Sequence, residues 1–288
     1  QLICNHQVPC SNHGAGTIPQ ALTNYHMIST ALLCPPTCFE VTYSINPWMK
    51  GEVVDKKIAM EQWLRLRGTL ESLGIKIRTI DPVPGLPDMV FTANAGTVHG
   101  KKVVLSNFRF EERQGETELF ERWFKDAGYT TYRLPKNLAF EGAGDTAIMG
   151  GKMFGGYGHR SSLGGLRRAA KHLEVELIPL KLAHPMFYHL DTCFCLIGNH
   201  CAFYYPHAFT PSAIKKLKAH IPDLIPIDVT DATQFACNSV IYDNQIIMPA
   251  GAQNIITEVD VRGYEVTEIN TSEFLKSGGS LQCMTLWM

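Results

Sequence analysis

The feature that most constrains the fold is an internal period of just under fifty residues. Short turns centred on Gly100, Gly150, Gly198 and Asp243 are separated by 50, 48 and 45 positions. Each turn joins two short apolar segments of strand character, and an amphipathic stretch and another apolar segment follow. A period of this size indicates one supersecondary unit that is repeated around an axis or along a solenoid. The repeat therefore predicts units of strand, turn, strand, helix and strand, five of them when an incomplete first unit is counted.

Apolar residues at helical spacing predict the helices of these units, which are expected at 55–73, 116–126, 163–173 and 212–220. In the incomplete first unit, alternating residues favour a strand at 38–45. Because short strands are mixed with amphipathic helices, we expect a closed α/β ring with strands inside and helices outside, not an all-β propeller. A doubly wound Rossmann sheet is the alternative. It would need a glycine fingerprint that opens a helix, whereas Gly142-x-Gly144 precedes the strand-like segment 146–148.

The overall composition excludes several classes of function. The 288 residues carry a net charge of −1 and have a pI near 6.9, so neither nucleic acid nor an anionic membrane is expected as a partner. No apolar run is long enough to span a bilayer, and the first residues do not resemble a signal peptide. The odd count of nine cysteines favours a reduced, cytoplasmic chain over a disulfide framework. A homo-oligomer is left open.

Residues 1–33 are expected to form an irregular N-terminal extension, and residues 34–288 a single domain. The extension begins with Gln instead of Met, as a fragment would, and has no helical or strand period. Four potential zinc ligands lie close together in it: Cys4, His6, Cys10 and His13. Their spacing is not one of the familiar structural zinc arrangements, so we interpret them as part of the extension and expect no metal.

The chemistry is expected to centre on Cys283. It follows a Gly-Gly-Ser run near the end of the chain, where the backbone can turn sharply and approach a ligand closely. Taken alone, the cysteine is better explained as a small buried apolar residue, as most free cysteines are. Two polar clusters in apolar or glycine-rich surroundings, at 140–145 and 188–192, change this interpretation.

The repeat predicts that the polar clusters meet. Glu141 and His189 each precede the turn of their unit by nine positions, and Asn94 precedes its turn by six. Residues at similar offsets in symmetric units converge near one end of the axis. Cys283, which belongs to the last unit, would lie at the same end of the axis and complete the ring.

A thiol, an imidazole and several acids together suggest attack on an amidine or guanidine carbon. A free thiol is mostly protonated at neutral pH, so Cys283 needs a nearby base, a cation or a substrate charge. His189 can accept the proton and later return it to a leaving amine. Carboxylates such as Asp191 suit the planar fork of donors of a guanidinium. A satisfied core histidine and structural ion pairs are the alternatives, and a papain-like protease is disfavoured because its cysteine segment is absent.

Four motifs in this order resemble the guanidine-modifying enzymes of the arginine deiminase, dimethylargininase and amidinotransferase superfamily. They are Phe91-Thr92-Ala93-Asn94, Phe140-Glu141-Gly142-x-Gly144-Asp145, His189-Leu190-Asp191-Thr192 and Gly278-Gly279-Ser280-x-x-Cys283. The resemblance runs from about residue 34 to the end. It implies a five-bladed α/β propeller (pentein) of ββαβ units with pseudo-fivefold symmetry, and makes 34–288 a single pentein catalytic domain.

The resemblance also implies a role for each motif residue. Cys283 would be the nucleophile, His189 the general acid/base, Glu141 the carboxylate that orients it, and Asp191 a ligand of the guanidinium. No metal or organic cofactor is expected, because a thiol and an imidazole suffice for the addition and elimination steps.

One departure from the superfamily points to a particular activity. Deiminases carry Phe-Thr-Arg-Asp where this chain ends the motif with Asn94. An aspartate only accepts hydrogen bonds, whereas an amide also donates, so Asn94 can hold a guanidinium and can also donate to the oxygen of a neutral ureido group. With this variant the chain looks most like the arginine dihydrolases, which convert arginine to ornithine, ammonia and carbon dioxide. That resemblance implies that Arg113 and Arg160 clamp the substrate α-carboxylate and that Asn46 lines the pocket. Without it, each arginine is better interpreted as a solvated surface charge.

Two other functions stay open. An arginine deiminase or dimethylargininase would stop at citrulline after one pass. A non-catalytic arginine-binding module would bind the small molecule without turnover.

Overall fold

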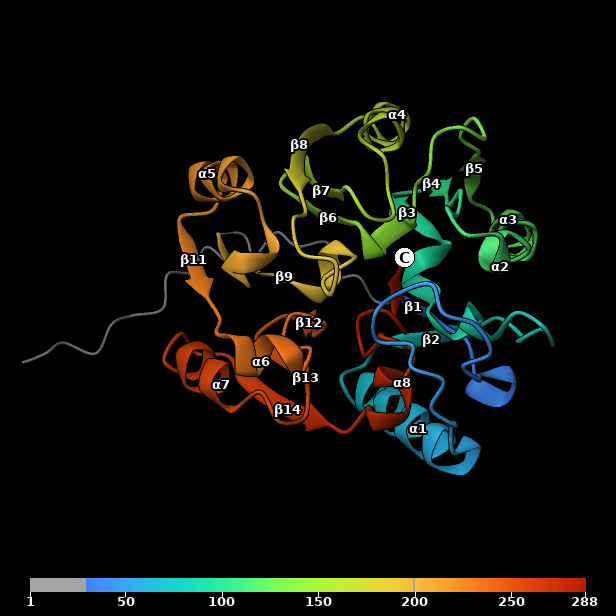
Figure 1. Ribbon diagram of the computed structural model, residues 1–288, viewed down its shortest axis with the longest axis horizontal. Helices are drawn as coiled ribbons and strands as arrows, with labels where there is room; N and C mark the ends of the chain where they lie inside the picture. The colour runs from blue at the N-terminus through green and yellow to red at the C-terminus, as the bar shows by residue number, and fades with distance from the viewer. Residues whose placement is uncertain (1–29, 199) are drawn as a thin grey trace, which may run out of the picture.

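The computed structural model describes residues 30–198 and 200–288, and in them the strands form five sheets of three strands each (Figure 1). The strand orders are β15-β1-β2, β3-β4-β5, β6-β7-β8, β9-β10-β11 and β12-β13-β14. In every sheet the middle strand pairs antiparallel with one neighbour and parallel with the other. The strands are β1 (Thr30–Leu33), β2 (Lys76–Thr79), β3 (Gly96–His99), β4 (Lys102–Leu105), β5 (Thr130–Tyr132), β6 (Thr146–Met149), β7 (Lys152–Tyr157), β8 (Glu176–Lys181), β9 (Phe194–Ile197), β10 (Cys201–Tyr204), β11 (Asp223–Pro226), β12 (Val240–Tyr242), β13 (Gln245–Pro249), β14 (Glu265–Ile269) and β15 (Leu286–Trp287).

A helix of at least eight residues lies in the connection between each pair of parallel strands, because a parallel pair needs a long crossover. These helices are α1 (Lys56–Ser72), α3 (Glu116–Asp126), α4 (Leu163–Leu173), α5 (Pro211–His220) and α7 (Gln253–Asp260). They lie outside the sheets in Figure 1 and pack their apolar faces inward. The shorter helices are α2 (Glu111–Gln114), α6 (Val229–Thr233) and α8 (Ser272–Leu275). The predicted helices 116–126 and 163–173 are confirmed, and 55–73 and 212–220 agree to within one residue at each end. Helix α7 was not predicted, since it is short and partly polar.

The strand predicted at 38–45 is wrong. Side chains of residues 39–45 alternate between buried or half-buried and exposed, as in a strand, but their backbone belongs to no strand of the described chain, and Pro36–Cys38 forms a 3-10 turn. The alternation reflects burial on one side only, without a pairing partner. The first sheet uses β1, which pairs with β2 and with the C-terminal strand β15. Thr30–Leu33 therefore belongs to the sheets, although we expected an irregular extension up to residue 33. The rest of that extension, including the four potential zinc ligands, lies outside the described residues.

Short 3-10 turns before the inner strands position the candidate site. Three of them, Thr92–Ala95, Gly142–Gly144 and Leu190–Thr192, precede β3, β6 and β9. Thr97 and Thr146 link the inner strands β3 and β6 through their hydroxyl oxygens, which are 2.6 Å apart. Residues of the inner strands β3, β6, β9 and β12 also line a cavity of about 1380 Å³, and Asp191 is among its lining residues. Among the helices of the described residues, none has the length and apolar character needed to cross a bilayer.

Candidate active site

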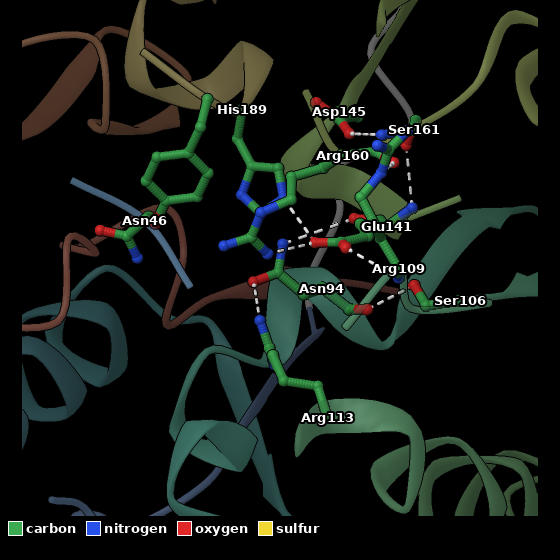
Figure 2. A network of polar contacts seen from close by, with 12 residues as sticks. Asn46, Asn94, Ser106, Arg109, Arg113, Glu141, Asp145, Arg160, Ser161 and His189 are labelled. Carbon is green, nitrogen blue, oxygen red and sulfur yellow. Dashed lines mark hydrogen bonds and ion pairs between the residues drawn. The ribbon is translucent and has the colours of Figure 1, made fainter. Parts of the chain in front are cut away.

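Glu141 and His189 are in direct contact, as their equal offsets in the repeat predict. His189 Nε2 lies 2.8 Å from Glu141 Oε2, and both side chains are buried (Figure 2). Arg160 Nη1 donates to the same carboxylate oxygen at 2.8 Å, and the backbone N–H of Arg109 donates to Oε1 at 3.2 Å. Burial would raise the pKa of Glu141, but the Arg160 guanidinium and the His189 hydrogen bond hold it well below its ordinary value. Glu141 is therefore a fixed anion that orients the imidazole.

The other imidazole nitrogen lies next to Gly144 and the Asn94 amide. His189 Nδ1 is buried and has no hydrogen-bond partner among residues 30–198 and 200–288. A methyl group on Gly144 would lie 3.2 Å from His189 Nδ1 and 2.1 Å from Asn94 Nδ2. Both nitrogens therefore lie close to Gly144, and only glycine leaves room there for the Asn94 amide.

The thiol of Cys283 lies against the same turn as the imidazole. Cys283 is 2% exposed, and its Sγ donates to Asp191 Oδ2 at 3.2 Å. Asp191 sits on the 3-10 turn Leu190–Thr192, whose N-terminal cap is His189. Burial, and then the neighbouring Asp191, raise the pKa of the Cys283 thiol well above its ordinary value. The thiol is therefore neutral until a cation offsets the charge of Asp191.

Asp191 has one carboxylate oxygen available for a ligand. Oδ2 accepts from the thiol, whereas Oδ1 is buried without a hydrogen-bond partner in the described part of the chain. Burial raises the pKa of Asp191 to about 7, and hydrogen bonds from Cys283 and Asn238 oppose that rise. A guanidinium would supply both the missing donors and the opposite charge.

Asn238 was not predicted as a site residue. Its Nδ2 donates to Cys283 Sγ at 3.1 Å, and its Oδ1 accepts from the Cys283 backbone N–H at 3.1 Å. The amide therefore fixes the Cys283 thiol and can also donate to a thiolate. Asn238 lies two residues ahead of β12, as Asn94 lies two residues ahead of β3. Counted from the turn, Asn238 precedes Asp243 by five positions, so the offsets of six and nine did not identify it.

Asn46 belongs to a loop that is tied to the segment before Cys283. Asn46 Nδ2 donates to the Ser277 carbonyl at 3.0 Å, and Trp48 Nε1 donates to the Met186 carbonyl at 2.7 Å. Gly278 has a φ of 79°, and a methyl group there would lie 2.8 Å from Asn46 Oδ1. The Gly-Gly-Ser run therefore approaches this loop as closely as its glycines allow.

Both predicted carboxylate clamps are buried, so the interpretation of Arg113 and Arg160 as surface charges is wrong; each is 3% exposed. The Arg160 guanidinium stacks between the rings of Phe110 and Tyr188, at 4.8 and 4.6 Å from their centroids. It also donates to Glu141 and to the Ile45 carbonyl. Arg113 contacts Glu116, the Asp88 carbonyl and the Asn94 amide.

Titratable side chains in the described residues include no group of three or more that could hold a metal ion. The seven described cysteines are free thiols. The arrangement consists of a buried thiol, an imidazole bound to a carboxylate, and a carboxylate oxygen without a partner in the described residues. Such groups can carry nucleophilic addition to a planar cation, followed by proton transfer.

Small three-stranded sheets with helices on their outer side, together with a buried thiol and an imidazole bound to a carboxylate, are typical of the pentein superfamily. The chain belongs to the family of N,N-dimethylarginine dimethylhydrolases, whose eukaryotic family model matches residues 42–288.

Among known proteins, the chain is 42% identical over 261 residues to the bifunctional arginine dihydrolase/ornithine cyclodeaminase ArgZ of Synechocystis sp.. That match covers 88% of this chain but only 37% of ArgZ. It is 36% identical to an N(G),N(G)-dimethylarginine dimethylaminohydrolase of Mycobacterium tuberculosis, over 88% of this chain and 84% of that protein. The crystal structure of the N-terminal domain of ArgZ bound to product superposes with a TM-score of 0.87 at 41% identity, covering 90% of this chain and 96% of that domain.

Proposed function

We propose that this protein is a hydrolase that acts on the guanidino group of free arginine and releases ornithine, two molecules of ammonia and carbon dioxide, with two waters consumed. The observation that carries the proposal is the buried Glu141–His189 pair at 2.8 Å, next to a thiol held by Asp191 and Asn238. The similarity to arginine dihydrolases and the amide at Asn94 support two successive hydrolysis reactions at Cys283 instead of one. Each reaction is called a pass below.

In the first pass, the guanidinium donates to Asp191 Oδ1 and its charge offsets that of the carboxylate. The pKa of Cys283 then falls, the thiol proton passes to His189, and Asn238 Nδ2 donates to the thiolate. The sulfur forms a bond to the guanidinium carbon, and His189 gives a proton to the departing ammonia. Water, activated by the same imidazole, then displaces the sulfur and leaves a ureido group.

In the second pass, Cys283 attacks the ureido carbon and a second ammonia leaves. Water hydrolyses the resulting thiocarbamate to a carbamate, which loses carbon dioxide and leaves ornithine. Arg113 and Arg160 were predicted to clamp the substrate α-carboxylate, and Asn46 to line the pocket. We propose the same roles here, because Arg160 Nη2 donates to the Ile45 carbonyl next to Asn46, and Arg113 Nη1 donates to the Asn94 amide oxygen.

We further propose that the five sheets are blades with pseudo-fivefold symmetry and that residues 30–288 form a single catalytic domain. The equal offsets of Glu141 and His189 ahead of β6 and β9 support this symmetry. Arginine is the proposed small-molecule partner. A cytoplasmic location and a homo-oligomer remain proposals from the sequence.

Mass-resolved product analysis tests the function, with arginine, methylated arginine and citrulline offered separately. Ornithine from both arginine and citrulline is the expected result. Citrulline that accumulates without ornithine would exclude the dihydrolase and favour a deiminase, and release of methylamines would favour a dimethylargininase. Binding of arginine without formation of any product would support the non-catalytic arginine-binding module.

Replacing Gly144 with alanine is expected to reduce kcat/KM by about 100-fold, because a displacement near 1 Å in a catalytic group has effects of that size. The added methyl group would lie 2.1 Å from Asn94 Nδ2, so the amide must move. Steady-state kinetics on arginine measure the effect. Gly68→Ala is the control, since that helical glycine has nothing within 4 Å of the new methyl group. Unchanged kinetics in Gly144→Ala would show that turnover does not depend on the position of the Asn94 amide.

The affinity for arginine is expected to fall as pH falls below 7. Burial raises the pKa of Asp191 to about 7, so the carboxylate gains a proton below that pH and loses its charge. Binding of the cation should weaken by up to about tenfold per pH unit, while binding of neutral citrulline should change little. Calorimetry with a Cys283→Ser variant separates binding from turnover. The slope should disappear in an Asp191→Asn variant, and a slope that persists there would assign it to another group.

A further inference from the structure

Phe235 has a backbone conformation that a residue with a side chain rarely adopts. Its φ is 60°, and it is one of three residues other than glycine with a positive φ in the described chain. It follows α6 in a Schellman arrangement: its N–H donates to the Ala232 carbonyl, and the next N–H donates to the Asp231 carbonyl, at 3.1 Å each. Glycine is the usual residue at this position, because a β-carbon is strained there. Contacts of the Phe235 side chain must therefore offset this strain.

The ring of Phe235 packs against the loop 44–50, which carries Trp48. Phe235 is 1% exposed, and its ring lies edge to face against Trp48, with 4.8 Å between the centroids and 67° between the planes. Ring pairs at this distance attract one another. Trp48 is itself fixed, because its Nε1 donates to the Met186 carbonyl at 2.7 Å and a methyl group on Gly278 would lie 3.0 Å from its Cβ. The loop 44–50 thus supplies contacts that hold Phe235 in place.

The backbone of Phe235 in turn positions Asn238. The Asn238 N–H donates to the Phe235 carbonyl at 2.8 Å, and the Asn238 side chain binds the thiol and the N–H of Cys283 at 3.1 Å each. The Asn238 carbonyl also accepts from the Gln282 N–H at 3.0 Å. Because the direction of the Phe235 carbonyl follows from its backbone angles, a change of conformation at this residue would move the Asn238 amide and the thiol with it.

We infer that Phe235 is a positioning residue that couples the packing of the loop 44–50 to the alignment of the Cys283 thiol. With Trp48 on its ring, Phe235 keeps the left-handed conformation, and the turn to Asn238 keeps the thiol in place. Without Trp48 the strain is no longer offset, and Asn238 loses its support. The inference rests on the proposed function, because it takes Cys283 as the reacting group.

This coupling links the reactivity of the thiol to the presence of substrate. The loop contacts a proposed carboxylate clamp, since Arg160 Nη2 donates to the Ile45 carbonyl at 3.0 Å. A substrate held by Arg160 would lie beside the loop and favour its packed position. The thiol is then aligned while the substrate is covered, and it is poorly aligned when the loop is open and water enters the site.

A double-mutant cycle between the two rings tests the inference. Phe235→Gly removes the ring and leaves the left-handed conformation free of strain, and Trp48→Ala removes its partner. Each change is expected to lower kcat/KM for arginine by about 100-fold, the effect of a displacement near 1 Å in a catalytic group. Both changes together should also cost about 100-fold, because they break one connection. Independent effects would multiply to about 10⁴-fold, and that result would overturn the inference.

The other end of the connection needs its own cycle, with Asn238→Ala. Phe235→Gly should have little further effect on kcat/KM in that background, because the amide that carries the effect to the thiol is gone. A ring that only anchors the loop would lower kcat/KM by the same factor with and without the Asn238 side chain. Such equal factors would refute the coupling to Cys283.

Thermal unfolding of each variant separates positioning from a merely structural role. Kinetics are measured well below the unfolding midpoint, where a variant that is only less stable keeps the kcat of the unmodified protein. If the glycine variant does not fold, Phe235→Leu keeps most of the buried volume and repeats the first cycle. Its expected loss is about tenfold, the size of one aromatic contact.

Glu174→Gly is the matched control. Glu174 has a φ of 58° at the end of α4, and its side chain is exposed. The substitution makes the same backbone change as Phe235→Gly without removing a buried ring, so kcat and KM should not change. Failure of the proposed function looks different from failure of the inference: the unmodified protein would then form no product from arginine, whereas an active protein with multiplying effects contradicts the role of Phe235 alone.

Discussion

Replacement of Cys283 by serine is expected to abolish turnover while leaving arginine binding intact. A serine hydroxyl can keep the hydrogen bonds that the thiol makes with Asp191 and Asn238, so the site should keep its shape. An alcohol is far less acidic than a thiol and no group in contact with it is a strong base, so the rate should fall by about 10⁴-fold or more.

Intact mass spectrometry of the unmodified protein during turnover should detect an adduct on Cys283, and the serine variant should show none. Cys201→Ser is the control, because that buried thiol also donates to a carboxylate, Asp223, and serine can replace it there. Ornithine formation by Cys283→Ser at the original rate would disprove covalent catalysis by this residue. Equal binding with no turnover by either protein would support the non-catalytic module.

Replacement of Glu141 by glutamine is expected to reduce both activity and stability. The neutral amide no longer fixes the tautomer of His189, and loss of such a carboxylate lowers kcat by about 10³-fold or more. It also leaves the buried Arg160 guanidinium without a charged partner, which costs about 3 kcal/mol in the free energy of unfolding. Both effects have the same origin, because one oxygen of Glu141 contacts both groups at 2.8 Å.

Denaturant unfolding and kcat should be measured on the same preparation. Glu121→Gln is the matched control: its partners Arg133 and Lys125 are about half exposed, so we expect a change of under about 1 kcal/mol and unchanged kcat. A fully active Glu141→Gln variant would show that the imidazole needs no carboxylate. An inactive variant of unchanged stability would contradict the account of Arg160.

Much of the fold could be predicted because its determinants are local. Turn residues at Gly100, Gly150 and Gly198 and the apolar faces of the helices lie within each repeat. Contacts between distant segments could not be predicted in this way. Strand β1 pairs with β15 at the other end of the chain, and neither short segment carries a pattern that identifies its partner.

The sequence by itself determined the repeating unit, the positions of four of the five crossover helices, and the meeting of Glu141 with His189, because equal offsets in equal units lead to the same place in space. Only the tertiary structure decided how Cys283 is held by Asn238, which direction the Asn94 amide faces, and which groups use the donors of Arg113. These depend on hydrogen bonds between side chains of different units. Their partners are chosen by burial, where every donor needs an acceptor, and no local pattern in the chain records that choice.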